Sequence, residues 1–199
     1  MTLEIETPHG PARAHLQLLK ASRAVLVLGH GAGGGVTARD LVIAARVANE
    51  EGIAVALVEQ PYRVAGRRAP APAAQLDAAW IAVVEHLRAG ALGGVPLLVG
   101  GRSSGARVAC RTVEATGAVA VLCLAFPLQP PGRATAPSRL PELDAIAVPT
   151  LVVQGARDPF GIPPPAKQRT VVQVASDHGL RSDLGSLGEA VRTWLRSQT

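Results

Sequence analysis

Three side chains in this sequence are of the types that together activate an alcohol for attack on a carbonyl carbon. Ser103 lies in a Gly-Arg-Ser-Ser-Gly stretch, Asp158 precedes a proline, and His178 follows an aspartate. A serine hydroxyl is a poor nucleophile at neutral pH, so a base must take its proton during attack and return it to the leaving group. A carboxylate beside that base fixes the imidazole tautomer and stabilises its cationic form. The sequence therefore predicts Ser103 as nucleophile, His178 as base and Asp158 as acid.

The surroundings of Ser103 favour this interpretation. Gly-x-Ser-x-Gly is typical of a tight turn from a strand into a helix. The apolar run 95–100 predicts a buried strand before the turn, and 106–113 predicts a helix after it. At such a turn the backbone N–H of Ser104 faces a developing oxyanion, and a second donor is expected from the glycine-rich loop 29–35, for which we select Ala32.

Strands and helices alternate along the rest of the chain. Strands are predicted at 24–28, 53–58, 118–124, 149–154 and 170–174, and helices at 41–48, 76–87 and 184–195. Residues 2–6 and 13–19 alternate in polarity, which predicts an antiparallel hairpin at a sheet edge. The pattern predicts an α/β fold, a mostly parallel sheet of about seven to eight strands with helices on both faces and no large lid domain.

The predicted topology brings the candidate residues to one place. The loops that carry Ala32, Ser103, Asp158 and His178 all follow predicted strands. Ligands of an open parallel sheet collect at the carboxyl ends of its strands. We therefore expect these four residues to line one crevice within a single domain, 1–199.

Local signals predict details that the structure can test. Thr37 with Asp40 resembles a capping box that would begin the helix at 41–48. The segments 59–72 and 126–148 are rich in proline and irregular, and we expect loops there, with one short helix in the second. These two loops are the material available to wall a pocket.

Composition excludes several classes of protein. The chain has 199 residues, 48% of them hydrophobic, and a net charge of +5. Its arginines are scattered, without a basic helix, stacking aromatics or a zinc pattern, so no nucleic-acid partner is expected. No signal pattern and no apolar run of about 18 residues is present, which predicts a cytoplasmic protein without a membrane partner. Cys110 and Cys123 read as small buried side chains, and neither a disulfide, a metal nor a cofactor is expected.

Other residues compete for the catalytic roles. His30 belongs to the glycine-rich loop and His86 to a helix end, so both are weaker candidates for the base than His178. Asp177 and Asp183 compete with Asp158 as the acid. Asp177 is adjacent to His178, which makes it difficult for its carboxylate to point at the ring.

Two nucleotide-binding patterns also occur. The stretch 29–34 matches Gly-x-Gly-x-x-Gly between a strand and a helix, and Glu59 ends the next strand, so an NAD(P)-binding protein stays open as an alternative. That interpretation leaves Ser103, Asp158 and His178 without a role. The stretch 100–105 has phosphate-loop spacing but is followed by Ala-Arg where Lys and Ser/Thr are required, which excludes it.

The sequence resembles the small, lid-less α/β-hydrolases of the dienelactone-hydrolase-like type. It resembles more narrowly the bacterial alpha/beta family hydrolases and a related domain of a non-specific-lethal-complex subunit. The matching segments are 29–34, 101–107, 126–132, 154–161 and 177–178. The resemblance implies the triad Ser103, Asp158 and His178. Dienelactone hydrolases proper use a cysteine nucleophile, and some relatives in the narrower group serve as scaffolds, so a non-catalytic interaction module stays open as an alternative to a serine hydrolase.

The expected substrate is a small acyl ester or a related carbonyl compound. Arg102 neighbours the nucleophile, and Arg63, Arg67 and Arg68 lie on a loop expected to overhang the site. These cations favour a substrate with a carboxylate or phosphate, unless they are solvated or paired with local acids. Candidate substrate-binding residues are His30, Gly31, Tyr62, Arg63, Arg102 and Phe160. The sequence does not indicate the oligomeric state.

Overall fold

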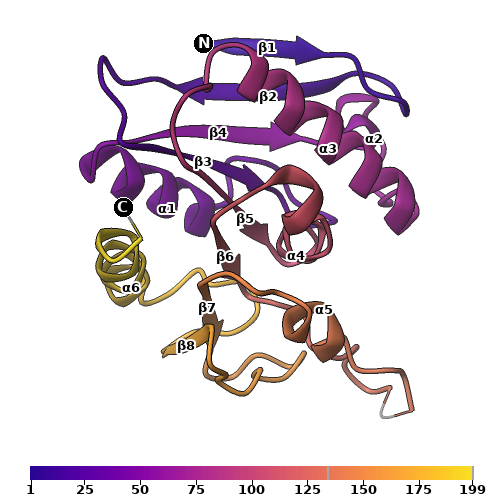
Figure 1. Ribbon diagram of the computed structural model, residues 1–199. Helices are drawn as coiled ribbons and strands as arrows, with labels where there is room; N and C mark the ends of the chain where they lie inside the picture. Colours follow the sequence, from indigo (N-terminus) through magenta and orange to yellow (C-terminus); the bar gives the residue numbers. More distant parts are fainter. Residues whose placement is uncertain (134, 199) are drawn as a thin grey trace.

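An eight-stranded sheet runs through the part of the chain described by the computed structural model, residues 1–133 and 135–198 (Figure 1). Its strands are β1 Thr2–Ile5, β2 Ala12–Gln17, β3 Ala24–Gly29, β4 Ile53–Glu59, β5 Leu97–Arg102, β6 Ala120–Leu124, β7 Thr150–Gly155 and β8 Arg169–Val174. Their order across the sheet is β1-β2-β4-β3-β5-β6-β7-β8. Neighbouring strands in the series β4-β3-β5-β6-β7-β8 are all parallel. The predicted hairpin of β1 and β2 is antiparallel and lies at the edge beside β4.

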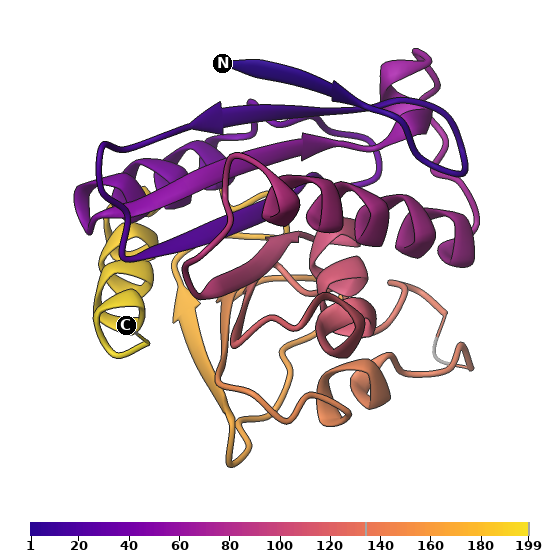
Figure 2. The same cartoon turned by 45° about the horizontal axis from the view of Figure 1, so that its top comes forward.

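Helices cover both faces of this sheet, as Figures 1 and 2 show. The helices are α1 Arg39–Glu50, α2 Pro61–Val64, α3 Ala73–Ala89, α4 Ser104–Thr116, α5 Leu140–Asp144 and α6 Leu184–Arg196. One apolar core packs α3, α4 and α5 on one face, and a second core packs α1 and α6 on the other. Because parallel strands are buried on both faces, β3 to β7 are almost continuously apolar. The predicted α/β architecture without a large lid is confirmed.

Two local expectations differ from the structure. The capping box is wrong, because α1 begins at Arg39 after Ala38 without any side-chain cap, and Asp40 makes other contacts described below. The segment 59–72 is only partly a loop, since Pro61 starts the short helix α2. The stretch 126–148 is mostly irregular with the expected short helix, α5, and residue 134 within it lies outside the described residues.

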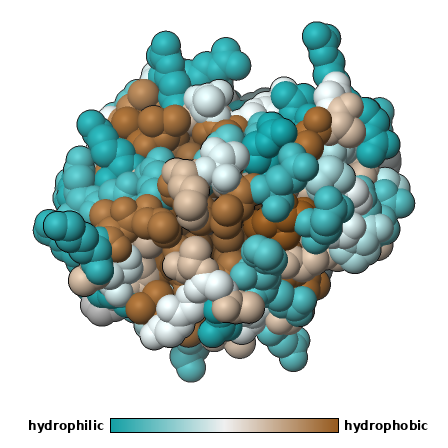
Figure 3. Space-filling view, turned by 90° about the horizontal axis from the view of Figure 1, so that it is seen from above, coloured by the Kyte–Doolittle hydropathy of each residue, from teal (hydrophilic) through white to brown (hydrophobic). Residues whose placement is uncertain are grey.

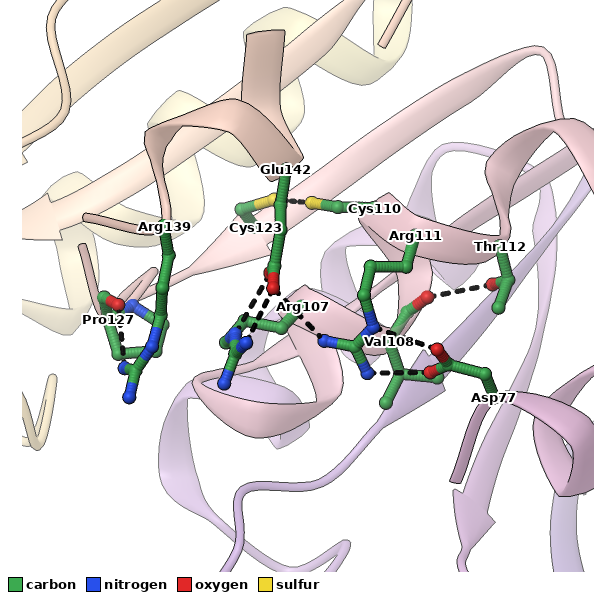
Figure 4. Close-up of polar contacts among 10 residues, drawn as sticks. All are labelled: Asp77, Arg107, Val108, Cys110, Arg111, Thr112, Cys123, Pro127, Arg139 and Glu142. Carbon is green, nitrogen blue, oxygen red and sulfur yellow. Dashed lines mark hydrogen bonds and ion pairs between the residues drawn. The ribbon is translucent and has the colours of Figure 1, made fainter. Parts of the chain in front are cut away.

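Arginines on the outer side of α4 are neutralised by acids from neighbouring helices (Figure 4). Arg107 binds Glu142 of α5 through Nε at 2.9 Å, and Arg111 binds Asp77 of α3 through Nε at 2.8 Å. These two-pronged ion pairs join α4 to both of its neighbours. The charges of these two arginines are therefore compensated within the fold.

The two cysteines lie in the core between α4 and β6. Their sulfur atoms are 3.5 Å apart, and both thiols are free and buried. Burial raises the pKa of the Cys110 thiol well above its ordinary value. A thiol held neutral in this way is a poor nucleophile and a poor metal ligand, which agrees with the prediction of a structural role.

Apolar side chains also reach the surface. Figure 3 shows apolar side chains in the middle of one face, bordered by polar ones. Met1 and Leu18, which flank the β1–β2 hairpin, are among the large apolar side chains that are exposed. Exposed apolar side chains are common on protein surfaces and do not by themselves define an interface. In the described part of the chain, no helix has the length and apolar character that a membrane crossing requires.

Candidate active site

The structure brings the three predicted catalytic side chains into hydrogen-bond contact. Ser103 Oγ lies 3.0 Å from His178 Nε2, and His178 Nδ1 lies 2.8 Å from Asp158 Oδ2. With Nδ1 protonated and donating to Asp158, Nε2 is left to accept the hydroxyl proton of Ser103. The three residues come from the ends of β5, β7 and β8, so segments up to 75 residues apart in sequence meet at one point.

Ser103 is held in a strained backbone conformation. Its φ of 52° and ψ of −107° lie in a region that L-residues with a side chain rarely adopt, and this conformation costs about 1–3 kcal/mol. The turn is retained because the N–H of Ser103 donates to the carbonyl of Leu124 at 2.9 Å and α4 begins at the next residue. This conformation presents Oγ to His178.

Glycines are required around Ser103 because β5 and α4 lie directly against the end of β3. A Cβ atom on Gly101 would lie 2.5 Å from the carbonyl oxygen of Gly29, and one on Gly105 would collide with the same carbonyl. The pentapeptide pattern thus reflects close packing of two backbones as well as the turn itself.

Asp158 is oriented by a buried amide that sequence reasoning missed. Gln154, the penultimate residue of β7, is fully buried, and its Nε2 donates to Asp158 Oδ2 at 2.7 Å. The same amide group lies 3.0 Å from the carbonyl oxygens of Phe126 and Gly161. The signal in the sequence was a single polar residue at the end of an apolar strand, four residues before the acid.

Phe160 contacts the triad directly. Its ring centroid lies 4.2 Å from that of His178 with a tilt of 35°, and its N–H donates to Asp158 Oδ1 at 2.9 Å. Asp158 Oδ1 and Oδ2 therefore both have donors when the carboxylate is ionised. The structure places Phe160 as a support for the acid and the base, next to where a substrate would bind.

Arg102 ties three segments of the site together. Its Nη2 donates to the main-chain carbonyl of His178 at 2.9 Å, and its Nε lies 3.3 Å from Asp40 Oδ2. Asp40 is only 1% exposed, and burial raises the pKa of its carboxyl, opposed by the nearby charge of Arg102. A Cβ on Gly31 would lie 2.8 Å from Arg102 Nη1, so this guanidinium also packs against the glycine-rich loop. The guanidinium of Arg102 is thus mostly occupied by contacts within the protein, and its predicted role in substrate binding stays a prediction.

His30 and Tyr62 are engaged within the protein, so their contact with substrate stays a prediction. His30 is buried, its Nε2 accepts the N–H of Gln60 at 3.1 Å, and its Nδ1 lies 2.8 Å from the Gly31 carbonyl. Burial lowers the pKa of His30, which keeps the ring neutral in this role. The Tyr62 hydroxyl donates to the Ala32 carbonyl at 2.9 Å, and its side chain is buried. Both residues hold the glycine-rich loop in place.

The loop they hold carries one of the two predicted oxyanion donors. Ala32 follows Gly31, which is buried against Arg102 and has no side chain to offer a substrate. Ser104 is the first residue of α4, so its N–H lies in the first helical turn, where the helix supplies no acceptor. The oxyanion roles of Ala32 and Ser104 stay predictions.

The competing acids and bases are directed elsewhere. Asp177 Oδ1 accepts the N–H of Gly179, and Asp183 Oδ2 accepts the N–H of Ala175. The hydrogen bond from Ala175 lowers the pKa of Asp183. His86 is exposed near the end of α3.

The dinucleotide-binding pattern at 29–34 lacks the helix that should follow it directly, because α1 begins only at Arg39, five residues beyond the last glycine of the pattern.

The arginine-rich loop makes contacts of its own, and its predicted place over the triad stays a prediction. Arg67 lines a small cavity beside His9 and Gln75, and the Nη1 of Arg63 donates to the Arg67 carbonyl at 3.4 Å. The contribution of Arg63 to substrate binding stays a prediction. A larger cavity of about 560 Å³ lies instead between the glycine-rich loop, the start of α1 and the histidine loop.

The sheet order, the serine on a strained strand–helix turn and the absence of a large lid define a lid-less α/β-hydrolase fold. The sequence pattern of the family described as "Alpha/beta hydrolase domain" matches residues 22–182, and the chain belongs to this family. No curated protein is similar enough in sequence to count as a relative.

Solved structures share the fold at low sequence identity. XC6422 from Xanthomonas campestris, described as an a/b serine hydrolase without lid, is 22% identical with a TM-score of 0.77, over 99% of this chain and 94% of that one. Est1E from Butyrivibrio proteoclasticus with ferulic acid bound is 17% identical with a TM-score of 0.80, over 98% of each chain. Dienelactone hydrolase from Anabaena variabilis is 13% identical with a TM-score of 0.77, over 100% of this chain and 97% of that one. These likenesses establish the fold.

Proposed function

We propose that this protein is a serine hydrolase of the carboxylesterase type, which cleaves small acyl esters through an acyl-enzyme intermediate. The observation that carries the proposal is the unbroken chain of hydrogen bonds from Ser103 Oγ through the His178 ring to Asp158 Oδ2. The solved structures with the same fold include EstE1, described as a thermostable carboxylesterase, and a protein described as a serine hydrolase, which supports the same class of reaction.

The first half of the reaction acylates Ser103. Its Oγ attacks the carbonyl carbon of the ester while the hydroxyl proton passes to His178 Nε2. The carbonyl oxygen becomes an oxyanion, for which the N–H groups of Ala32 and Ser104 are the proposed donors. Collapse of the tetrahedral intermediate breaks the bond to the alcohol oxygen, which leaves with the proton from Nε2.

The second half restores the enzyme. A water molecule attacks the acyl carbon, gives its proton to His178 Nε2, and the acid product leaves as Oγ regains that proton. Throughout both halves the carboxylate of Asp158, held by Gln154 and Phe160, stabilises the imidazolium. The proton transfers between Oγ and Nε2 use atoms that already lie within hydrogen-bond distance.

Labelling with a fluorophosphonate probe tests the proposal. The probe reacts with activated serine hydroxyls, so the protein should be labelled once, at Ser103. Ser103→Ala should abolish labelling and lower ester turnover by about 10³-fold or more at an unchanged far-UV circular dichroism spectrum. Ser22→Ala, which removes a partly exposed serine just before β3, is the control and should retain both.

The alternative, a non-catalytic interaction module, predicts a different result. A folded protein that the probe does not label, and that turns over none of a panel of p-nitrophenyl esters of two to eight acyl carbons, would overturn the proposed activity.

A further inference from the structure

The lining of the cavity beside the triad consists largely of glycines and arginines. It measures about 560 Å³, within the range of pockets that bind small ligands, and is lined by the glycines 33–35, the start of α1, Arg102, Gly179 and Arg181. Arg102 directly precedes the nucleophile, and Gly179 directly follows the base. The cavity is therefore lined by the immediate chain neighbours of Ser103 and His178.

Three arginines line this cavity, and two of them have no acidic partner. Arg102 is paired with Asp40, the acid on the cavity wall, so these two charges largely cancel. Neither Arg39 nor Arg181 forms an ion pair within 4 Å in the described part of the chain. Arg107 and Arg111 of α4, by contrast, each hold a carboxylate in two-pronged contact. The cavity thus retains uncompensated positive charge from two separate segments of the chain.

The remaining wall leaves space for a ligand beside these charges. A Cβ atom on Gly33 or Gly35 would meet nothing within 4 Å, so the loop bounds the cavity without filling it. A guanidinium is planar and offers several donors, which matches the geometry of carboxylate and phosphate oxygens. A neutral apolar tail finds few apolar partners in this space.

We infer that Arg39 and Arg181 form a subsite for an anionic group, a carboxylate or a phosphate, carried by the substrate at a short distance from its reacting carbonyl. The inference rests on the proposed hydrolase activity and specifies its substrate class. It differs from the expectation drawn from the sequence, in which Arg102 with Arg63, Arg67 and Arg68 supplied the positive rim. Glutarate hemiesters have a suitable shape, with a carboxylate three methylene groups from the acyl carbon.

Two isosteric esters measure this preference. p-Nitrophenyl hemiglutarate and p-nitrophenyl valerate share the leaving group and chain length, and differ in a terminal carboxylate against a methyl group. We expect kcat/KM for the hemiglutarate to exceed that for the valerate by about tenfold or more in low salt, and the excess to shrink as ionic strength rises. In the double variant Arg39→Gln/Arg181→Gln the ratio of the two kcat/KM values should fall to about one. Only kcat/KM for the hemiglutarate should change, and that for the valerate should stay the same.

Arg46→Gln is the matched control. Arg46 lies on the same helix as Arg39, is exposed, and pairs with Glu50 away from the cavity. Arg46→Gln removes one positive charge from the same helix. An equal fall of the kcat/KM ratio in Arg46→Gln would therefore indicate long-range attraction and overturn the subsite. An unchanged ratio in the double variant, with valerate turnover intact, would overturn it as well.

A binding measurement separates failure of the subsite from failure of the proposed function. Glutarate, the hydrolysis product, is titrated calorimetrically into the wild-type protein and the double variant, which needs no turnover. Saturable binding that the double variant loses and Arg46→Gln retains supports the subsite even in a protein that cleaves no ester. Absence of binding to the wild type, or equal binding to the double variant, contradicts it whatever the outcome of probe labelling.

Discussion

Arg102 donates a hydrogen bond of 2.9 Å to the main-chain carbonyl of His178, so the residue before the proposed nucleophile holds the backbone of the proposed base. The same guanidinium is anchored by the buried carboxylate of Asp40. The distance between Ser103 Oγ and His178 Nε2 therefore depends on a contact outside the triad.

Replacing Arg102 by Gln should impair both activity and folding. Loss of the bond to His178 should lower kcat about 10- to 100-fold with less effect on KM, because the loop of the base is released. Asp40 would remain buried without its partner, which costs about 3–5 kcal/mol in the free energy of unfolding. Steady-state kinetics and urea unfolding measure the two effects, and an unchanged kcat in a folded protein would contradict the first.

The pH dependence of that variant identifies the cause of instability. Burial already raises the pKa of Asp40, and removal of the Arg102 charge should raise it further. A raised folded-state pKa means that the folded protein keeps a proton that the unfolded chain releases, so the loss of stability should grow as pH rises above about 4. Arg102→Gln/Asp40→Asn should recover stability at pH 7 while kcat stays low, since the His178 carbonyl still lacks its donor.

Gln154→Leu should destabilise the protein by about 1–3 kcal/mol, because the carbonyls of Phe126 and Gly161 lose a buried amide whose two N–H groups they share with Asp158. Asp158 loses a donor as well, so kcat should fall more than KM rises. Gln173→Leu, which replaces a more exposed glutamine on β8, is the control and should leave kcat unchanged. Equal kcat values for both variants would exclude an orienting role for Gln154.

Two glycine-to-alanine changes should have opposite effects on stability. A Cβ at Gly105 collides with the carbonyl of Gly29, so Gly105→Ala forces β3 and α4 apart and should lower the midpoint of thermal unfolding by several degrees or more. Gly185 lies in α6 with nothing within 4 Å of its missing Cβ, so Gly185→Ala should stabilise by up to about 1 kcal/mol. Differential scanning calorimetry of the pair checks both signs.

Glu51 should make stability sensitive to acid. Hydrogen bonds from Arg196 and Arg192 lower its pKa to about 2, and these bonds join the end of α1 to α6. A lowered folded-state pKa gives a stabilisation that is present above pH 4.5 and is lost as pH falls towards 2. In urea titrations across this range Glu51→Gln should be less stable than the wild type at pH 7, and the difference should vanish near pH 2. A constant difference would contradict this origin.

The alternation of strands and helices was readable from the sequence because each parallel strand is apolar on both faces. The meeting of Ser103, Asp158 and His178 was readable because each follows such a strand, and the topology brings strand ends together. The NAD(P)-binding pattern fitted less well for the same reason, since it left those residues unused.

Side-chain partners across the sheet were not readable in this way. His30 and Tyr62 carry polar atoms in a loop near the site, which suggested substrate contact, yet both face main-chain groups. Asp40 fitted the spacing of a capping box, but its partner is Arg102, 62 residues away. Contacts of this kind depend on how separate segments pack, and no local pattern encodes them.

At Ser103 the backbone conformation with positive φ lowers the stability of the fold, while the side chain supplies the hydroxyl for the proposed reaction. Glycine adopts that conformation without strain, so Ser103→Gly should yield a longer-lived, inert protein. A serine at this position therefore costs free energy of folding that glycine would not cost, and the proposed chemistry is the one reason in the structure for keeping a hydroxyl there.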